Sequence, residues 1–349
     1  MAYTTINKST DYFNTKLYTG SGSAQSLTGV GFQPDWIWIK NRSYADHHKV
    51  VDRVRWVSSS NSAQLSTNQN SAAGTQAIIT SFDSDGFTLT TGDRGWNSSN
   101  GDNFVSWNWK ANGQGSSNTD GTINTTYTSA NTTAGFSISQ YTGTGSNATI
   151  GHGLGAAPKL VIIKKTNTTA DWLIGQEGLG GWNYVLNFSV SGRADQSAQF
   201  QSTAPSSSLI TLGTDGQVNG SGATYICYAF APKTGFSKFG SYQGNGQQSD
   251  NAFVYTGFKP ALVIIKRRDQ DTNWVMFDTA RDTYNEGSKV LLPDNSAAET
   301  SGSQKIDFLS NGFKIRSSGN NTGDSSPYIY MCFAEAPLVG SNNVPATAR

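Results

Sequence analysis

The sequence has 349 residues, of which 36% are hydrophobic, 11% aromatic and only 14% charged, and its formal net charge is +1. This balance gives no electrostatic reason to bind nucleic acid, because proteins bind polyanions mainly through Lys and Arg. The 9 Trp, 14 Tyr and 17 Phe residues exclude a disordered chain, which would be poor in aromatic residues. At about 100–200 residues per domain, the length predicts two or three domains.

The first segment, Met1–Ile6, lacks the basic stretch followed by an apolar stretch that marks a secretion signal. We therefore expect synthesis in the cytoplasm without a signal peptide. The longest apolar runs, such as Leu160–Ile163 and Ala261–Ile265, are far shorter than the ~20 residues that span a bilayer. Membrane insertion is therefore not expected.

A pattern of Pro, five mostly apolar residues and Lys occurs three times, as Pro34–Lys40, Pro158–Lys164 and Pro260–Lys266. Each copy is followed by a second apolar run, by an Asp-Gly or Asn-Gly turn and by an alternating aromatic run. The closing aromatic runs are Phe104–Trp109, Tyr225–Phe230 and Tyr328–Phe333. The interval from the repeated Lys to the last aromatic residue is 66 to 69 residues in every copy. This regular spacing indicates an internal triplication.

The repeated runs alternate with a period of two and are rich in β-branched and aromatic residues, which is typical of strands. In Trp36–Ile39 both faces are apolar, as expected of a central strand that is covered on both sides. The turns at Asp85-Gly86, Asp215-Gly216 and Asn311-Gly312 favour hairpins, because the tightest hairpin turns need residues that adopt positive φ.

We therefore predict an all-β protein made of three tandem antiparallel β-sandwich repeats of the jelly-roll type. The predicted repeats are residues 1–112, 134–232 and 252–349, and the segments 113–133 and 233–251 are polar connectors rich in Ser, Gly, Asn and Gln. We expect the three repeats to follow one another in a row, although they could also form a body with approximate threefold symmetry.

Residue types that support catalysis or metal binding are few. His47 and His48 are neighbours, and adjacent side chains on an extended chain point to opposite faces. His152 lies in a glycine-rich stretch that precedes a strand, whereas a phosphate-binding loop precedes a helix. Asp83 and Asp85 are not followed by the Glu that a calcium loop requires. We therefore expect no enzymatic activity, no cofactor and no metal.

Two further observations concern polar and thiol groups inside the predicted strands and loops. Asp52 and Arg55, and likewise Asp278 and Arg281, are spaced to form ion pairs that hold a loop; an exposed pair of this kind contributes only about 0–1 kcal/mol. Two cysteines are too few for a disulfide framework or a zinc site. Because both lie in apolar, aromatic runs, we expect buried free thiols.

The tryptophans suggest either core packing or ligand contact. Four of them lie in predicted strands at alternate positions and are expected in the core: Trp36, Trp38, Trp107 and Trp109. Trp96 and Trp182 lie in loops rich in Gly, Asn and Ser. We predict that these two rings lie at the surface and contact a ligand, because flat exposed rings stack on sugars.

Four segments carry a resemblance to a known family: residues 1–6, 31–42, 141–159 and 333–349. They are similar to structural proteins of tailed bacteriophages, especially marine phages, which are often described as tail fibres or minor structural proteins. The resemblance covers nearly the whole chain. It implies a virion protein and supplies no catalytic residues.

The leading hypothesis is a non-enzymatic protein of the virion surface, either a capsid decoration protein or a head fibre. Its expected partners are other virion proteins and further copies of the chain. One alternative is a tail fibre or adhesin that binds host surface glycans through Trp96 and Trp182. A second alternative is an enzyme that degrades polysaccharide.

Overall fold

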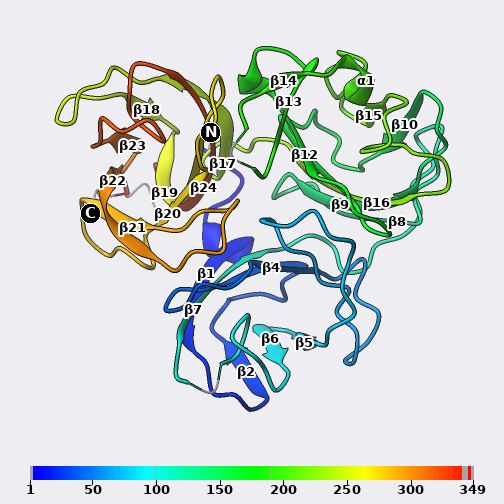
Figure 1. Ribbon diagram of the computed structural model, residues 1–349, viewed down its shortest axis with the longest axis horizontal. Coiled ribbons are helices and arrows are strands. Elements are labelled where there is room, and N and C mark those ends of the chain that lie inside the picture. The colour runs from blue at the N-terminus through cyan, green and yellow to red at the C-terminus, as the bar shows by residue number, and fades with distance from the viewer. Residues whose placement is uncertain (1–2, 99, 190, 340–344, 347–349) are drawn as a thin grey trace.

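The computed structural model describes residues 3–98, 100–189, 191–339 and 345–346. The protein is all-β, with 43% of residues in strands and 3% in helices, as predicted. Figure 1 shows three groups of strands around a common centre. We call the segments that carry β1–β7, β8–β16 and β17–β24 the first, second and third lobes.

The first lobe contains a four-stranded sheet and a three-stranded sheet, both antiparallel. In sheet order the four strands are β1 (Phe13–Thr19), β7 (Asn103–Trp109), β3 (Trp36–Asn41) and β4 (Lys49–Asp52). The second sheet has β2 (Gln25–Thr28), β6 (Gly86–Leu89) and β5 (Ile79–Asp83), and a short 3-10 helix, η1 (Ser9–Asp11), precedes β1.

The second lobe contains a seven-stranded sheet and a two-stranded sheet. The larger sheet has the order β14 (Ala194–Asp195), β13 (Tyr184–Asn187), β12 (Trp172–Gln176), β11 (Leu160–Lys165), β16 (Thr224–Phe230), β9 (Phe136–Thr142) and β8 (Tyr127–Asn131). The smaller sheet pairs β10 (Ala148–Gly151) with β15 (Leu209–Leu212), and the helical turns are η2 (Glu177–Leu179) and α1 (Ser197–Phe200).

The third lobe contains two four-stranded sheets. One has the order β17 (Ser237–Gln243), β24 (Pro327–Pro337), β19 (Phe258–Arg267) and β20 (Val275–Asp278). The other has the order β18 (Phe253–Tyr255), β23 (Gly312–Ile315), β22 (Thr300–Leu309) and β21 (Gly287–Val290).

The same strand order recurs in the three lobes, because β1-β7-β3-β4, β9-β16-β11-β12 and β17-β24-β19-β20 are arranged alike. The register also recurs. The first residue of the repeated apolar run pairs with the last aromatic residue of the closing run, as in Trp36 with Trp109, Leu160 with Phe230 and Leu262 with Phe333. The triplication inferred from the sequence therefore reappears in strand pairing.

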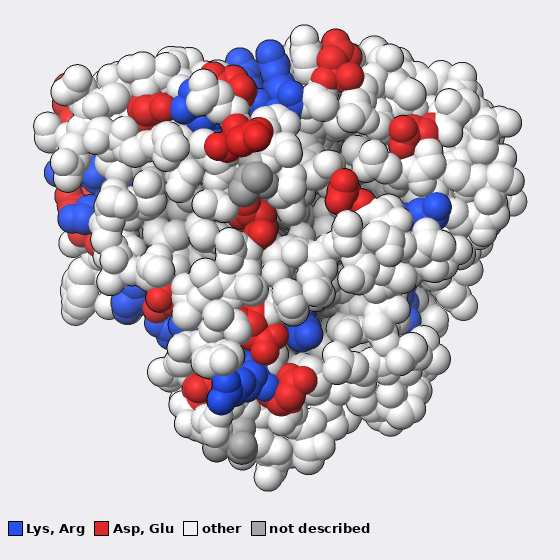
Figure 2. Space-filling view, viewed as in Figure 1, with Lys and Arg blue, Asp and Glu red and all other residues white. Residues whose placement is uncertain are grey.

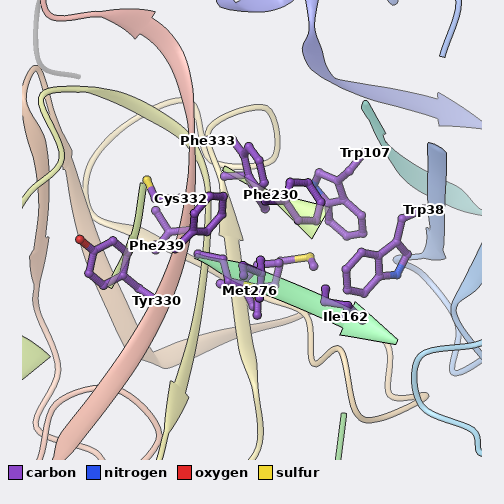
Figure 3. Packing of buried hydrophobic residues seen from close by; sticks show 14 of the residues in the cluster. Trp38, Trp107, Ile162, Phe230, Phe239, Met276, Tyr330, Cys332 and Phe333 are labelled. Atoms are coloured by element: carbon purple, nitrogen blue, oxygen red, sulfur yellow. The ribbon is translucent and has the colours of Figure 1, made fainter. Parts of the chain in front are cut away.

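One apolar cluster joins all three lobes. Trp36 and Trp38 face this cluster, whereas Ile37 and Ile39 on the opposite face pack inside the first lobe. The ring centroids of Trp36 and Tyr228 are 4.8 Å apart. Figure 3 shows side chains from the three lobes packed together: Trp38, Trp107, Ile162, Phe230, Met276 and Phe333. The expectation of three units in a row is therefore wrong, because the large aromatic residues on the inner faces are buried only where the lobes meet.

Both predicted connectors contain strands, which corrects the sequence interpretation. Strand β8 lies within 113–133 and pairs with β9, and β17 lies within 233–251 and pairs with β24. These are edge strands, so their outward positions carry the polar residues that resemble a linker. The first strand of the third lobe therefore begins before the predicted boundary at residue 252.

Predicted hairpins occur in the first and third lobes, where β5 is joined to β6 and β22 to β23 by two-residue turns. In the second lobe the prediction is wrong. Strand β15 pairs with β10, and the chain turns at Asp215, whose carbonyl accepts hydrogen bonds from the backbone of Val218 and Asn219.

Cys227 and Cys332 are buried and free, as predicted. Within the described residues, no helix is long and apolar enough to cross a bilayer.

Candidate functional site

A carboxylate at the end of β4 links the first lobe to the second. Asp52 is fully buried, and its Oδ2 accepts hydrogen bonds from Arg55 Nε and from Tyr228 Oη, each at 2.7 Å. The ion pair with Arg55 was predicted from the spacing. The burial of this pair was not predicted. Removing one partner of a buried pair lowers the free energy of unfolding much more than removing one partner of an exposed pair.

The equivalent carboxylate at the end of β20 links the third lobe to the first. Asp278 Oδ2 forms an ion pair with Arg281 and accepts a hydrogen bond from Trp107 Nε1 at 3.1 Å. Arg281 also donates to Glu299 at 3.1 Å, and Arg42 of the first lobe donates to the same carboxylate at 2.8 Å. The side chains of Asp278 and Arg281 are fully buried.

Gln176 takes the corresponding place in the second lobe, where the sequence has no Asp-Arg pair. It is fully buried, and its Nε2 donates to the carbonyl of Tyr330 in the third lobe at 2.9 Å. The residue of the third lobe equivalent to Trp107 and Tyr228 is Met331, whose thioether has no hydrogen to donate. A carboxylate there would have no donor opposite it, which accounts for the neutral amide.

The repeated Lys of the sequence pattern is fully buried in each lobe. Lys40 Nζ donates to the carbonyl of Asn41 at 2.7 Å, Lys164 Nζ to those of Ala170 at 2.8 Å and Asn70 at 3.1 Å, and Lys266 Nζ to that of Gln270 at 3.2 Å. Each ammonium group therefore satisfies backbone carbonyl groups, that of Asn41 at the end of β3 and those of loop residues beside Lys164 and Lys266. Burial lowers the pKa of each of the three lysines from 10.5 to about 8.

This lowered pKa predicts how stability depends on pH. Between about pH 8 and 10.5 the unfolded chain binds more protons at Lys164 than the folded chain does, so its contribution to folding becomes more favourable as pH rises. Replacing Lys164 with Met should make the rise in stability over pH 8 to 10 less steep. At pH 7 the variant should be about 1–3 kcal/mol less stable than the wild type, because carbonyls lose their donor.

Urea unfolding at several pH values measures this effect. The matched control is Lys165→Met, since the neighbouring Lys165 is only partly buried and should keep the slope of the wild type. Equal slopes for Lys164→Met and the wild type would contradict the assignment.

A pocket of about 510 Å³ lies where loops of the three lobes meet. It is lined by His47 and Asn68 of the first lobe, Asp171 and Trp172 of the second, and Asp294 of the third, among others. His47 Nδ1 lies 2.8 Å from the Asn68 side-chain amide. Burial raises the pKa of Asp294 from 3.8 to about 6. The pocket thus offers amide groups and the exposed carboxylate of Asp171, which suit a neutral or cationic polar ligand.

Trp96 and Trp182 do not lie at the surface, which corrects the sequence-based expectation. They are only 5% and 7% exposed, and each belongs to the apolar cluster inside its lobe. Glycines make room for both rings, because a Cβ at Gly92 would lie 2.7 Å from Trp96 and one at Gly175 would lie 2.8 Å from Trp182. Neither ring face is open for stacking on a sugar in this conformation.

The histidines and paired aspartates have structural partners, and His48 Nε2 lies 2.9 Å from the carbonyl of Leu292 in the third lobe. His48 is buried, with Nδ1 accepting from Trp38 Nε1 at 2.8 Å, and His152 Nε2 lies 3.3 Å from the carbonyl of Ser206. Asp85 accepts hydrogen bonds from two backbone amides of the segment that follows β2. Among the residues that the structure describes, no three His, Cys, Asp or Glu side chains are grouped to hold a metal ion.

Exposed aromatic residues occur at positions that sequence reasoning missed. Tyr3, Phe253 and Tyr255 are 38%, 48% and 49% exposed. Phe253 and Tyr255 flank a buried residue on the edge strand β18. The alternation of side chains along Phe253–Tyr255 is compatible with a strand. Which face of that strand is exposed depends on where the strand lies in the molecule.

A family model described as a domain of unknown function, DUF7483, matches residues 8–337, from the start of the first lobe to the end of β24. The chain belongs to the DUF7483 family. No curated protein and no solved structure matches the chain. The DUF7483 match includes all three lobes in one continuous unit, in keeping with their common core.

Proposed function

We propose that this chain is a non-enzymatic structural protein of a virion surface, most specifically a capsid decoration protein or head fibre. The observation that carries the proposal is the closed order of contacts between lobes, from Asp52 to the second lobe, from Gln176 to the third and from Asp278 back to the first. A rigid body with three similar lobes suits a position where three capsid subunits meet, since protein assemblies follow closed symmetry.

We also propose that each lobe is an antiparallel β-sandwich of the jelly-roll type, so that the chain contains three of them in tandem. It is supported by a separate apolar cluster inside the first lobe and another inside the second, each containing residues from both sheets of its lobe. The proposed partners are other virion proteins and further copies of the chain. Figure 2 shows a mostly uncharged face on which acidic and basic residues are scattered, a surface suited to contacts that do not depend on strong charge.

Virions that lack the protein test this role. They should keep tail-dependent adsorption to the host and lose infectivity faster than wild-type virions when the heads are heated. Supplying purified protein should restore the stability of the heads. Failed adsorption together with heads of unchanged stability would contradict a decoration role and place the protein on the tail.

Catalysis on polysaccharide is not part of the proposal. Asp171 and Asp294 both line the pocket where the three lobes meet, but Asp294 Oδ2 is shielded from solvent and Oδ1 accepts from the backbone amide of Trp274 at 3.1 Å. A glycosidase needs a carboxyl group that reaches the glycosidic oxygen. Purified protein should therefore release no reducing ends from host envelope polysaccharide. Release that is abolished by Asp294→Asn would contradict this expectation.

A further inference from the structure

A second pocket, of about 320 Å³, lies between the N-terminal segment, the chain leading into β17 and the turn between β18 and β19. We call it the tyrosine cleft. Its side chains include Tyr3, Lys233, Thr234, Ser237, Lys238 and Tyr255. The N-terminal segment is held against the third lobe, because Thr4 Oγ1 donates to the carbonyl of Thr234 at 2.6 Å.

Two exposed but fixed aromatic rings form walls of the tyrosine cleft. Tyr3 and Tyr255 are 38% and 49% exposed, and Tyr3 Oη donates to the carbonyl of Gly257 at 2.7 Å. Partial burial, together with the nearby hydroxyl of Tyr255, raises the pKa of Tyr3 to about 12. The Tyr3 phenol therefore stays neutral over the physiological range. Both tyrosine rings offer apolar faces together with polar edges.

The glycine at position 257 is required for this arrangement. It has a φ of +81°, and a Cβ there would lie 2.6 Å from Tyr3 Oη. The backbone can thus approach the tyrosine hydroxyl closely, and the cleft keeps its shape.

Both lysines of the tyrosine cleft are free of acidic partners among the described residues. Lys238 Nζ donates to the carbonyl of Tyr255 at 2.7 Å and lies 5.4 Å from the centroid of its ring. None of the described residues lining the cleft is acidic. The tyrosine cleft is therefore a basic site in a protein whose net charge is only +1.

We propose that the tyrosine cleft binds an acidic saccharide, a sugar that carries a carboxylate such as a hexuronate. The apolar face of the sugar ring would lie on Tyr255, and its carboxylate would accept from Lys238 or Lys233. Thr234 also lines the pocket. A simple anion would use the lysines and leave both rings uncovered, whereas a neutral sugar would use the rings and leave both charges unmatched. This inference does not depend on the virion role.

Calorimetric titration of the full chain with digalacturonic acid tests the inference, with neutral galactobiose and acetate as comparison ligands. Digalacturonic acid should bind at least tenfold more tightly than either comparison ligand. Tyr255→Ala and Lys238→Gln should each weaken its binding about tenfold, which corresponds to about 1.4 kcal/mol. Lys238→Gln should also reduce the preference over galactobiose, because it removes the charge and keeps most of the side chain.

Two control variants lie close to the tyrosine cleft and outside it. Phe253→Ala removes an exposed ring two residues from Tyr255, and Lys314→Gln removes a positive charge on the neighbouring strand β23. Both should leave binding within twofold of the wild type, and thermal unfolding should verify that every variant is folded. Absence of binding, equal binding of galactobiose or acetate, or an equal loss in the controls would each overturn the proposal.

Discussion

Replacing Asp278 with alanine is expected to lower the free energy of unfolding by about 3–5 kcal/mol, because the change leaves a buried charge without its partner. Arg281 is fully buried and would keep only Glu299 as an acidic neighbour among the described residues. Trp107 Nε1 would also lose its acceptor at the contact between the third and first lobes. Urea unfolding followed by circular dichroism measures the loss.

Two comparison variants separate the effect of burial from the loss of charge. Asp11→Ala removes the acidic partner of an exposed ion pair with Lys8 and should change stability by less than about 1 kcal/mol. The double replacement Asp278→Leu with Arg281→Met should recover most of the stability that Asp278→Ala loses, since apolar residues of similar volume can replace a buried pair. A loss below 1 kcal/mol for Asp278→Ala would show that the carboxylate is not essential to the contact between lobes.

Trp36→Ala should lower the free energy of unfolding by about 3–5 kcal/mol, the usual cost of removing a large aromatic side chain from a core. Trp36 lies 4.4 Å from Trp109 in its own lobe and 4.8 Å from Tyr228 in the second lobe, measured between ring centroids. Because the cluster joins the three lobes, we expect them to unfold together in both the wild type and the variant.

Unfolding curves from tryptophan fluorescence and from far-ultraviolet circular dichroism should therefore coincide. The control is Tyr284→Ala, which removes an aromatic ring that is 81% exposed and should change stability by at most about 0.5 kcal/mol. Separate transitions for different lobes, with Trp36→Ala shifting only the first, would contradict a common core.

Local patterns in the sequence predicted the strands well, and the reason is physical. The repeated runs around Trp36, Leu160 and Leu262 alternate between two buried faces, and this alternation is a property of each strand alone. The constant interval to the closing aromatic run reflects the recurring pairing of β3, β11 and β19 with their closing strands. A repeated pattern of this kind predicts pairing even when the chain between the two strands varies.

Two aspects of the fold depend on contacts between distant segments and could not be read locally. Strand β17 has a half-exposed pattern rich in Ser, Gly and Gln, and it is a strand because β24 supplies its partner. The inner faces of Trp36–Ile39 and Leu160–Ile163 were recognised as apolar, but an apolar face does not specify whether its cover comes from the same repeat or from another one.

The candidate sites illustrate the same limit. Trp96 and Trp182 were predicted at the surface because their neighbours in sequence are polar, but glycines in the surrounding chain let both rings reach the interior. The tyrosine cleft combines Tyr3 with Tyr255, which are separated by most of the chain. Spacing could predict that Asp278 meets Arg281, whereas Trp107 as its second partner emerges only from the packing of lobes.

Three of the polar contacts between lobes occupy equivalent positions and use different side chains, so each is specific for one pair of lobes. Asp52 needs the hydroxyl of Tyr228, Asp278 needs the indole of Trp107, and Gln176 is suited to the backbone beside Met331. A chimera in which the second lobe is replaced by a copy of the first would bury a carboxylate against a thioether. The three repeats thus carry different side chains at equivalent positions, and each of these side chains matches the partner that the next lobe presents.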